Sequence, residues 1–81
     1  MTYFKVRNDI SVATLTRILK AMYHYLKVND YVPIIDVIPA GVKDLRIYMP
    51  PGLPQEAWKD LLNLNIENMP RNGIVLVEEE D

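Results

Sequence analysis

The stretch TYFKVRNDISVATLTRILK, residues 2–20, predicts two different elements in succession, because the spacing of its apolar residues changes along it. In its first six residues, apolar positions alternate with polar or aromatic ones: Phe4 and Val6 against Tyr3, Lys5 and Arg7. This alternation is typical of a β-strand with one buried face. Asn8, Asp9 and Ser11 then offer side chains that cap a helix N-terminus. The stretch therefore predicts a strand followed by a helix.

The helix is predicted from about residue 12 to residue 28. Its apolar residues recur every three or four positions and form one stripe: Leu15, Ile18, Leu19, Met22 and Leu26. Such a stripe is the pattern of an amphipathic helix with one face on a core. Asn29 and Asp30 end the helix.

Two strands are predicted next. YVPIIDVIP (31–39) is rich in valine and isoleucine, and Pro33 favours an edge position because proline donates no ladder hydrogen bond. Ala40 and Gly41 turn the chain, and DLRIYM (44–49) alternates again.

The last third of the chain predicts a second helix and a last strand. The helix covers about 54–64, with Pro54 as its first residue. Its inward residues are expected to be Ala57, Trp58, Leu61 and Leu62. A loop at 68–73 leads to the strand GIVLV (73–77).

The predicted order is β-α-β-β-α-β. In a chain of 81 residues this order predicts an α+β protein of ferredoxin-like architecture. Its antiparallel four-stranded sheet would have the spatial order 4-1-3-2, with both helices on one face. We expect one domain over 1–77 and an acidic tail over 78–81; a different α+β topology or a swapped dimer of this unit is the alternative.

Composition narrows the classes of function. The chain has no cysteine, which excludes disulfides and thiolate chemistry and fits a cytoplasmic location. No apolar run approaches the roughly 20 residues of a membrane span. The formal net charge of −2 is uneven, because residues 1–28 are basic and the last four residues are all acidic. This asymmetry points to an anionic partner.

Period-two alternation places a group of aromatic and basic residues on the uncovered sheet face: Tyr3, Lys5, Arg7, Arg46 and Tyr48. Tyrosine rings stack on bases, and arginine and lysine bind phosphates. The arrangement resembles the RNA-recognition-motif family, which has aromatics on the first and third strands of this topology. The family's glycine-containing third-strand motif is replaced here by KDLRIYMP. The resemblance implies DNA or RNA as a partner, with Tyr3 and Tyr48 as stacking residues.

Two other interpretations of this face remain open. Tyrosine, arginine and lysine are ordinary residues on a solvated antiparallel sheet. The outer strands, however, are apolar on both faces, and exposed apolar area on a small domain indicates a partner. Homodimerisation through the sheet face or edge is therefore the rival, with Ile34 and Leu76 as interface candidates.

The first helix offers a second basic surface. Arg17, Lys20, His24 and Lys27 recur at spacings of three and four, opposite the apolar stripe. Such a row suits contact with phosphates, although a charged outer face is common to surface helices.

Catalytic, metal and cofactor signatures are missing. His24 is the only histidine, so no histidine or cysteine pair exists for a metal site. The three glycines are too scattered for a phosphate-binding loop. We therefore expect a small non-enzymatic binding protein, without a cofactor or small-molecule substrate, that binds nucleic acid or serves as a homodimeric interaction or assembly module. In its size and its Ile/Val/Tyr/Lys/Glu-rich sequence the chain resembles the short orphan proteins of archaeal viruses and mobile elements, for which a role in genome handling or virion assembly is expected.

Overall fold

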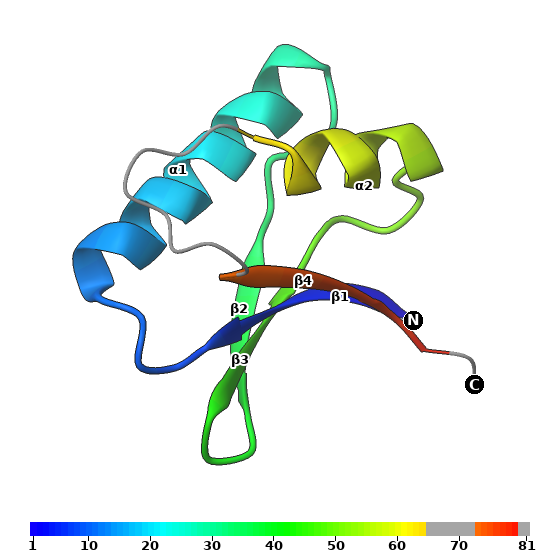
Figure 1. Cartoon of the computed structure of the whole chain (residues 1–81). Coiled ribbons are helices and arrows are strands. Elements are labelled where there is room, and N and C mark those ends of the chain that lie inside the picture. Colours follow the sequence, from blue (N-terminus) through cyan, green and yellow to red (C-terminus); the bar gives the residue numbers. More distant parts are fainter. Residues whose placement is uncertain (65–72, 80–81) are drawn as a thin grey trace.

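The computed structural model describes residues 1–64 and 73–79 of the chain. It contains four strands and two helices, in the order β1 (Thr2–Arg7), α1 (Val12–Val28), β2 (Asp36–Ala40), β3 (Asp44–Tyr48), α2 (Gln55–Leu62) and β4 (Ile74–Glu78). The strands form one antiparallel sheet in the order β2-β3-β1-β4. Both helices lie over the same face of this sheet (Figure 1). The predicted α+β class, with a four-stranded antiparallel sheet and two helices, is confirmed.

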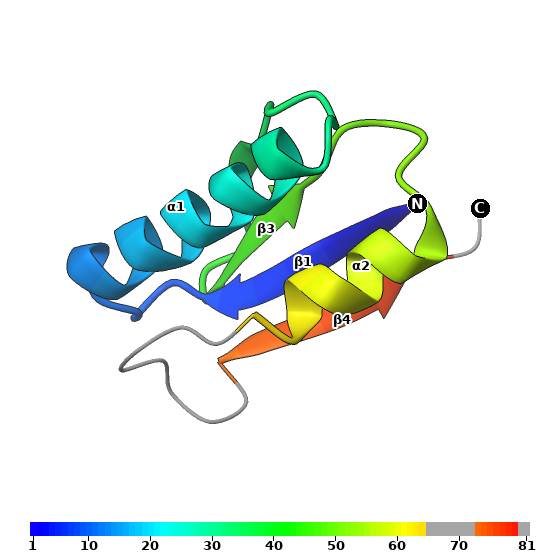
Figure 2. The ribbon, with the colours of Figure 1, turned by 90° about the horizontal axis from the view of Figure 1, so that it is seen from above.

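The core lies between the sheet and the two helices. The sheet and both helices contribute to it: Phe4, Val6 and Ile47 from the sheet, Ile18 and Met22 from α1, and Trp58 and Leu61 from α2. Viewed from above, α1 runs along the β3 side of the sheet and α2 covers β1 and β4 (Figure 2). The apolar stripe of α1 faces this core, as its period predicted.

The ends of the helices have local causes. Of the three predicted caps, Ser11 is the N-cap of α1, and its hydroxyl accepts a hydrogen bond from the Thr14 N–H at 3.1 Å. Pro54 is the N-cap of α2 and lies outside the helix, in place of the predicted first helical position. Leu62, predicted to point inward, is exposed in the last turn of α2.

The second strand is shorter than the predicted 31–39. Continuing its register towards the N-terminus would pair residues 33 and 34 with Pro51 and Pro50. Pro33, Pro50 and Pro51 lack an N–H, so Ile34 is the only donor among these four residues. The Ile34 N–H bonds instead to the Val32 carbonyl at 2.9 Å, and the strand begins at Asp36.

The last strand runs one residue beyond the predicted domain end. It includes Glu78, and Glu79 continues the pairing, since its N–H bonds to the Met1 carbonyl at 2.8 Å. The predicted acidic tail therefore begins inside the sheet. Most of the predicted loop at 68–73 lies outside the described residues. In the part of the chain that the structure describes, neither helix has the length and apolarity that crossing a membrane requires.

Candidate functional site

The sheet register brings together the residues that alternation placed on the uncovered face. The antiparallel pairing of β1 with β3 sets Tyr3 opposite Tyr48, Lys5 opposite Arg46, and Arg7 opposite Asp44. Directly opposite residues of an antiparallel pair share one face. Aromatic and basic side chains therefore do gather at the centre of the open face.

Tyr3, predicted to stack on a base, is nevertheless buried on this face. The residue is only 3% exposed although no helix covers its side of the sheet. The Arg46 guanidinium lies over its ring, 4.5 Å from the centroid, and the Tyr48 ring lies 5.5 Å away. A base that stacked on Tyr3 would first have to displace Arg46.

Glu79, at the edge of the sheet, contacts both Tyr3 and Arg46. The Tyr3 hydroxyl donates a hydrogen bond of 2.7 Å to the Glu79 carboxylate. Arg46 Nη2 lies 4.0 Å from the same oxygen, and Arg46 Nη1 lies 3.3 Å from the Tyr48 hydroxyl. We call these four residues, Tyr3, Arg46, Tyr48 and Glu79, the Tyr3 cluster.

Two pKa shifts follow from the contacts of the cluster. The hydrogen bond to Glu79 raises the pKa of the Tyr3 hydroxyl, and burial raises it further. The hydrogen bond to Tyr48 raises the pKa of the Arg46 guanidinium. Both shifts favour the protonated form, which is the neutral phenol of Tyr3 and the charged guanidinium of Arg46.

The charges of the open face balance. Among the described residues, three cationic side chains of this face are matched by three carboxylates that register or contact places there: Lys5, Arg7 and Arg46 against Asp36, Asp44 and Glu79. Arg7 also forms an exposed ion pair of 2.8 Å with Asp9. A balanced surface attracts a polyanion weakly, because affinity for phosphates depends on net cations.

The outer surface of α1 is different. Arg17, Lys20, His24 and Lys27 are all exposed and lie within an arc of roughly 80° at about 100° per residue. We call them the basic strip. The helix contains no aspartate or glutamate. Among the described residues, no carboxylate lies within 4.0 Å of a basic group of the strip.

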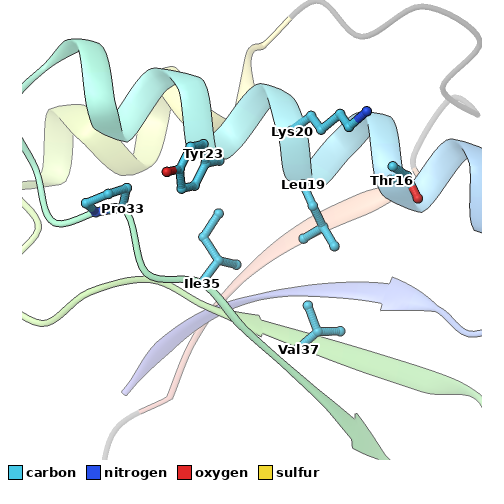
Figure 3. A pocket seen from close by; sticks show the side chains of 7 residues that line it. All are labelled: Thr16, Leu19, Lys20, Tyr23, Pro33, Ile35 and Val37. Atoms are coloured by element: carbon cyan, nitrogen blue, oxygen red, sulfur yellow. The ribbon is translucent and has the colours of Figure 1, made fainter.

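An apolar groove borders the strip, between α1 and the segment that leads into β2 (Figure 3). Its volume is about 410 Å³, and it is lined by Thr16, Leu19, Lys20, Tyr23, Pro33, Ile35 and Val37. Tyr23 stands at its rim and is 45% exposed. Lys20 belongs to both surfaces, so a cation lies directly beside an apolar cleft.

The two interface candidates lie in different environments. Ile34 is 59% exposed. Leu76 lies opposite Phe4 on the helix-covered face and packs against the core. The Leu76 side chain is therefore part of the packing within one chain and does not lie exposed on a binding face.

The structure also decides which face of the second strand is buried. Ile35 and Val37 pack against the core, whereas Val32, Ile34 and Ile38 are exposed. Ile38 lies opposite Arg46 on the open face. Hydrophobicity alone did not distinguish the two sets, because both are branched aliphatic residues.

No arrangement of side chains in the described ranges resembles a metal centre, since no three histidine, aspartate or glutamate residues come together there.

One phenol has an unusual environment. The Tyr25 hydroxyl donates a hydrogen bond of 2.8 Å to Asp60 and joins α1 to α2. Desolvation, and then this bond, raises the pKa of Tyr25 to about 12.

Sequence reasoning missed two contributors to these surfaces. The sequence predicts Glu79 in the acidic tail, although extending the alternation of Val75 and Val77 by one step places it on the open face. The groove was missed because Pro33 and Tyr23 are distant in sequence and meet only through tertiary packing.

Comparison with known proteins assigns no relative: no family model matches the chain, and no curated protein or solved structure matches it either.

Proposed function

We propose that this protein is a small non-enzymatic domain that binds single-stranded DNA or RNA through the basic strip of α1. The observation that carries the proposal is the acid-free helix, whose four basic residues lie on one exposed arc: Arg17, Lys20, His24 and Lys27. Cations that are not matched by carboxylates of the same surface are the electrostatic basis of phosphate binding.

The adjoining groove favours a single strand over a duplex. Single-stranded nucleic acids present unstacked bases that are held by aromatic and apolar side chains. Tyr23 at the rim, with Leu19 and Ile35 below it, supplies such a surface next to Lys20. In this proposal phosphates follow the strip while one base enters the groove.

The open sheet face is the weaker candidate. Its cations are matched by carboxylates, and Tyr3 is covered by Arg46. Lys5 and Tyr48 remain partly accessible there and would at most add to binding centred on α1.

We further propose to class the fold as ferredoxin-like. The supporting observations are the element order β-α-β-β-α-β, the antiparallel pairing, and the sheet order, which reads 4-1-3-2 when counted from β4. This class carries many unrelated functions, so it adds nothing to the argument for nucleic acid.

The test is fluorescence anisotropy with labelled single-stranded RNA, single-stranded DNA and duplex DNA at low and physiological salt. A triple variant of the strip, Arg17→Gln/Lys20→Gln/Lys27→Gln, removes three charges. Its matched control, Lys5→Gln/Lys43→Gln/Lys59→Gln, removes three exposed charges from β1, the β2–β3 hairpin and α2.

For three phosphate contacts, log K should fall with log salt at a slope of about −2.1 on single strands. The strip variant should lose this binding, and the control should keep most of it. Equal losses in both variants would show that overall charge, not the strip, drives association. Absence of binding by the wild type at low salt would overturn the proposal.

The second candidate is a homodimeric interaction or assembly module. The observation that favours it is a set of exposed apolar residues: Ile34 just before β2, Ile38 in β2 and Val75 in β4. Sedimentation equilibrium tests it, because a module of this kind has a mass above the 9.4 kDa of one chain.

A further inference from the structure

The two edges of the sheet differ in the hydrogen-bonding groups that they present. In an antiparallel pair, residues alternate between those bonded to the partner and those whose N–H and C=O point away from it. The phase of this alternation at each edge follows from three backbone bonds and the strand registers.

At the β4 edge the phase is set by Glu79. Its N–H bonds to the Met1 carbonyl, and the Met1 nitrogen bonds to the Glu79 carbonyl at 2.6 Å, so these two residues form a hydrogen-bonded pair. Alternation then directs the N–H and C=O groups of Ile74, Leu76 and Glu78 away from β1. The outer edge of β4 therefore offers three donors and three acceptors. In the described part of the chain no strand pairs with that edge.

The β2 edge offers fewer hydrogen-bond donors than the β4 edge. The bond from the Asn8 N–H to the Lys43 carbonyl shows which residues of β3 are hydrogen-bonded to β1. The remaining residues of β3 bond to β2, and the register of β2 with β3 then shows which residues of β2 bond inward. The groups of Val37 and Pro39 then point outward. Pro39 has no N–H, so Val37 is the only outward donor within β2. Proline on an edge is a common protection against strand addition, and β4 contains no proline.

We propose that β4 pairs with β4 of a second copy of this chain, antiparallel about a two-fold axis at Leu76. This register sets Leu76 opposite Leu76 and Ile74 opposite Glu78, and it uses all six outward groups of each strand. Registers centred on Val75 or Val77 leave outward groups of β4 unpaired within the strand.

Charge selects the same register. A centre at Glu78 would set two glutamates directly opposite each other, which is destabilising. The Leu76 centre separates the two Glu78 residues by four positions along the sheet, roughly 14 Å. It also sets Val75, 47% exposed, opposite Val77 of the other copy on the open face. The two sheets become one sheet of eight strands, and α1 lies far from the axis in both copies. The inference therefore does not depend on nucleic-acid binding.

Cysteine cross-linking tests the register. The chain has no cysteine, so each introduced thiol is the only one present. In the proposed register Val75 and Val77 of the other copy form a non-hydrogen-bonded pair with Cα atoms about 4.5 Å apart, within the range of a disulfide. Val75 and its own symmetry mate are offset by two residues, beyond the roughly 7 Å limit.

Val75→Cys and Val77→Cys proteins, one of them isotope-labelled, are mixed under reducing conditions and then oxidised. We expect a disulfide dimer of intermediate mass in the mixture, and little dimer from either variant alone. Val42→Cys, in the exposed turn between β2 and β3, is mixed with Val75→Cys as the control for collisional cross-linking. Both sites face the open side of the sheet, so the substitutions spare the core, which Leu76→Asp would not.

Homodimers of Val75→Cys alone or of Val77→Cys alone would show a different register and overturn the Leu76 centre. Yields in the mixture no higher than with Val42→Cys, from protein that is folded by circular dichroism, would overturn the β4 edge as the interface.

Discussion

Arg46 on the sheet and Lys20 on α1 carry the same charge but have different surroundings. Arg46 lies on the Tyr3 ring and beside Glu79, so the chain itself supplies its aromatic and its anion. Lys20 lies among other cations at the rim of an apolar groove, and no carboxylate among the described residues pairs with it. A basic residue therefore indicates a ligand surface only where the fold has not already provided its partner.

The largest expected contrast is between two tyrosines. Tyr3→Ala removes a ring buried among Arg46, Tyr48 and the sheet, so the urea midpoint should fall markedly. Tyr23→Ala removes an exposed ring and should change the free energy of unfolding by no more than about 0.5 kcal/mol. Equal effects in chemical denaturation would mean that the Tyr3 cluster does not form as described.

A second contrast separates binding from stability. Lys20→Gln should reduce the salt slope for single strands by about 0.7 and leave the urea midpoint unchanged. Arg46→Gln should lower the urea midpoint, because Tyr3 loses its cover, and leave the slope unchanged. Anisotropy titrations and urea unfolding on the same preparations check both. The reverse pattern would place the ligand on the open sheet face.

The hydrogen bond that joins α1 to α2, from Tyr25 to Asp60, should be lost at high pH. The folded protein raises the pKa of Tyr25 from 10.0 to about 12, so the neutral phenol is favoured by folding. The contribution of this phenol to the free energy of unfolding is fully present below pH 10 and is lost as the pH rises towards 12. Tyr25→Phe should cost about 0.5–1.5 kcal/mol near neutral pH and make the loss of stability between pH 10 and 12 smaller than in the wild type. Thermal unfolding and phenolate absorbance, each compared with the wild type, measure the two effects.

The smallest effect should come from opening the Tyr3 cluster. Glu79→Ala removes a half-exposed carboxylate 4.0 Å from Arg46, so it should cost at most about 1 kcal/mol. It should also lower the pKa of Tyr3, because the hydrogen bond to Glu79 is the main cause of the raised value. Phenolate titration of this variant against Glu78→Ala, which changes the neighbouring glutamate, isolates the contact. An unchanged titration would show that Glu79 does not close the cluster.

Much of the architecture was readable from residue spacing. The change from alternation at Phe4 and Val6 to the helical stripe of Ile18 and Met22 predicted β1 and α1, and Ser11 was among the predicted caps. These features are local, since a period and a cap are properties of a few neighbouring residues. Boundaries were less accurate where distant partners decide them, as where Pro50 and Pro51 limit the pairing of β2.

The candidate sites divide in the same way. Residue spacing alone predicts the basic strip, because residues three and four apart on a helix share a face whatever surrounds them. Three other features come from tertiary contacts: Arg46 covers Tyr3, Glu79 reaches both of them, and Tyr23 meets Pro33 across a groove. The physical reason is that charge balance and exposure depend on residues brought together by strand register and packing, and register joins positions as distant as Tyr3 and Val77.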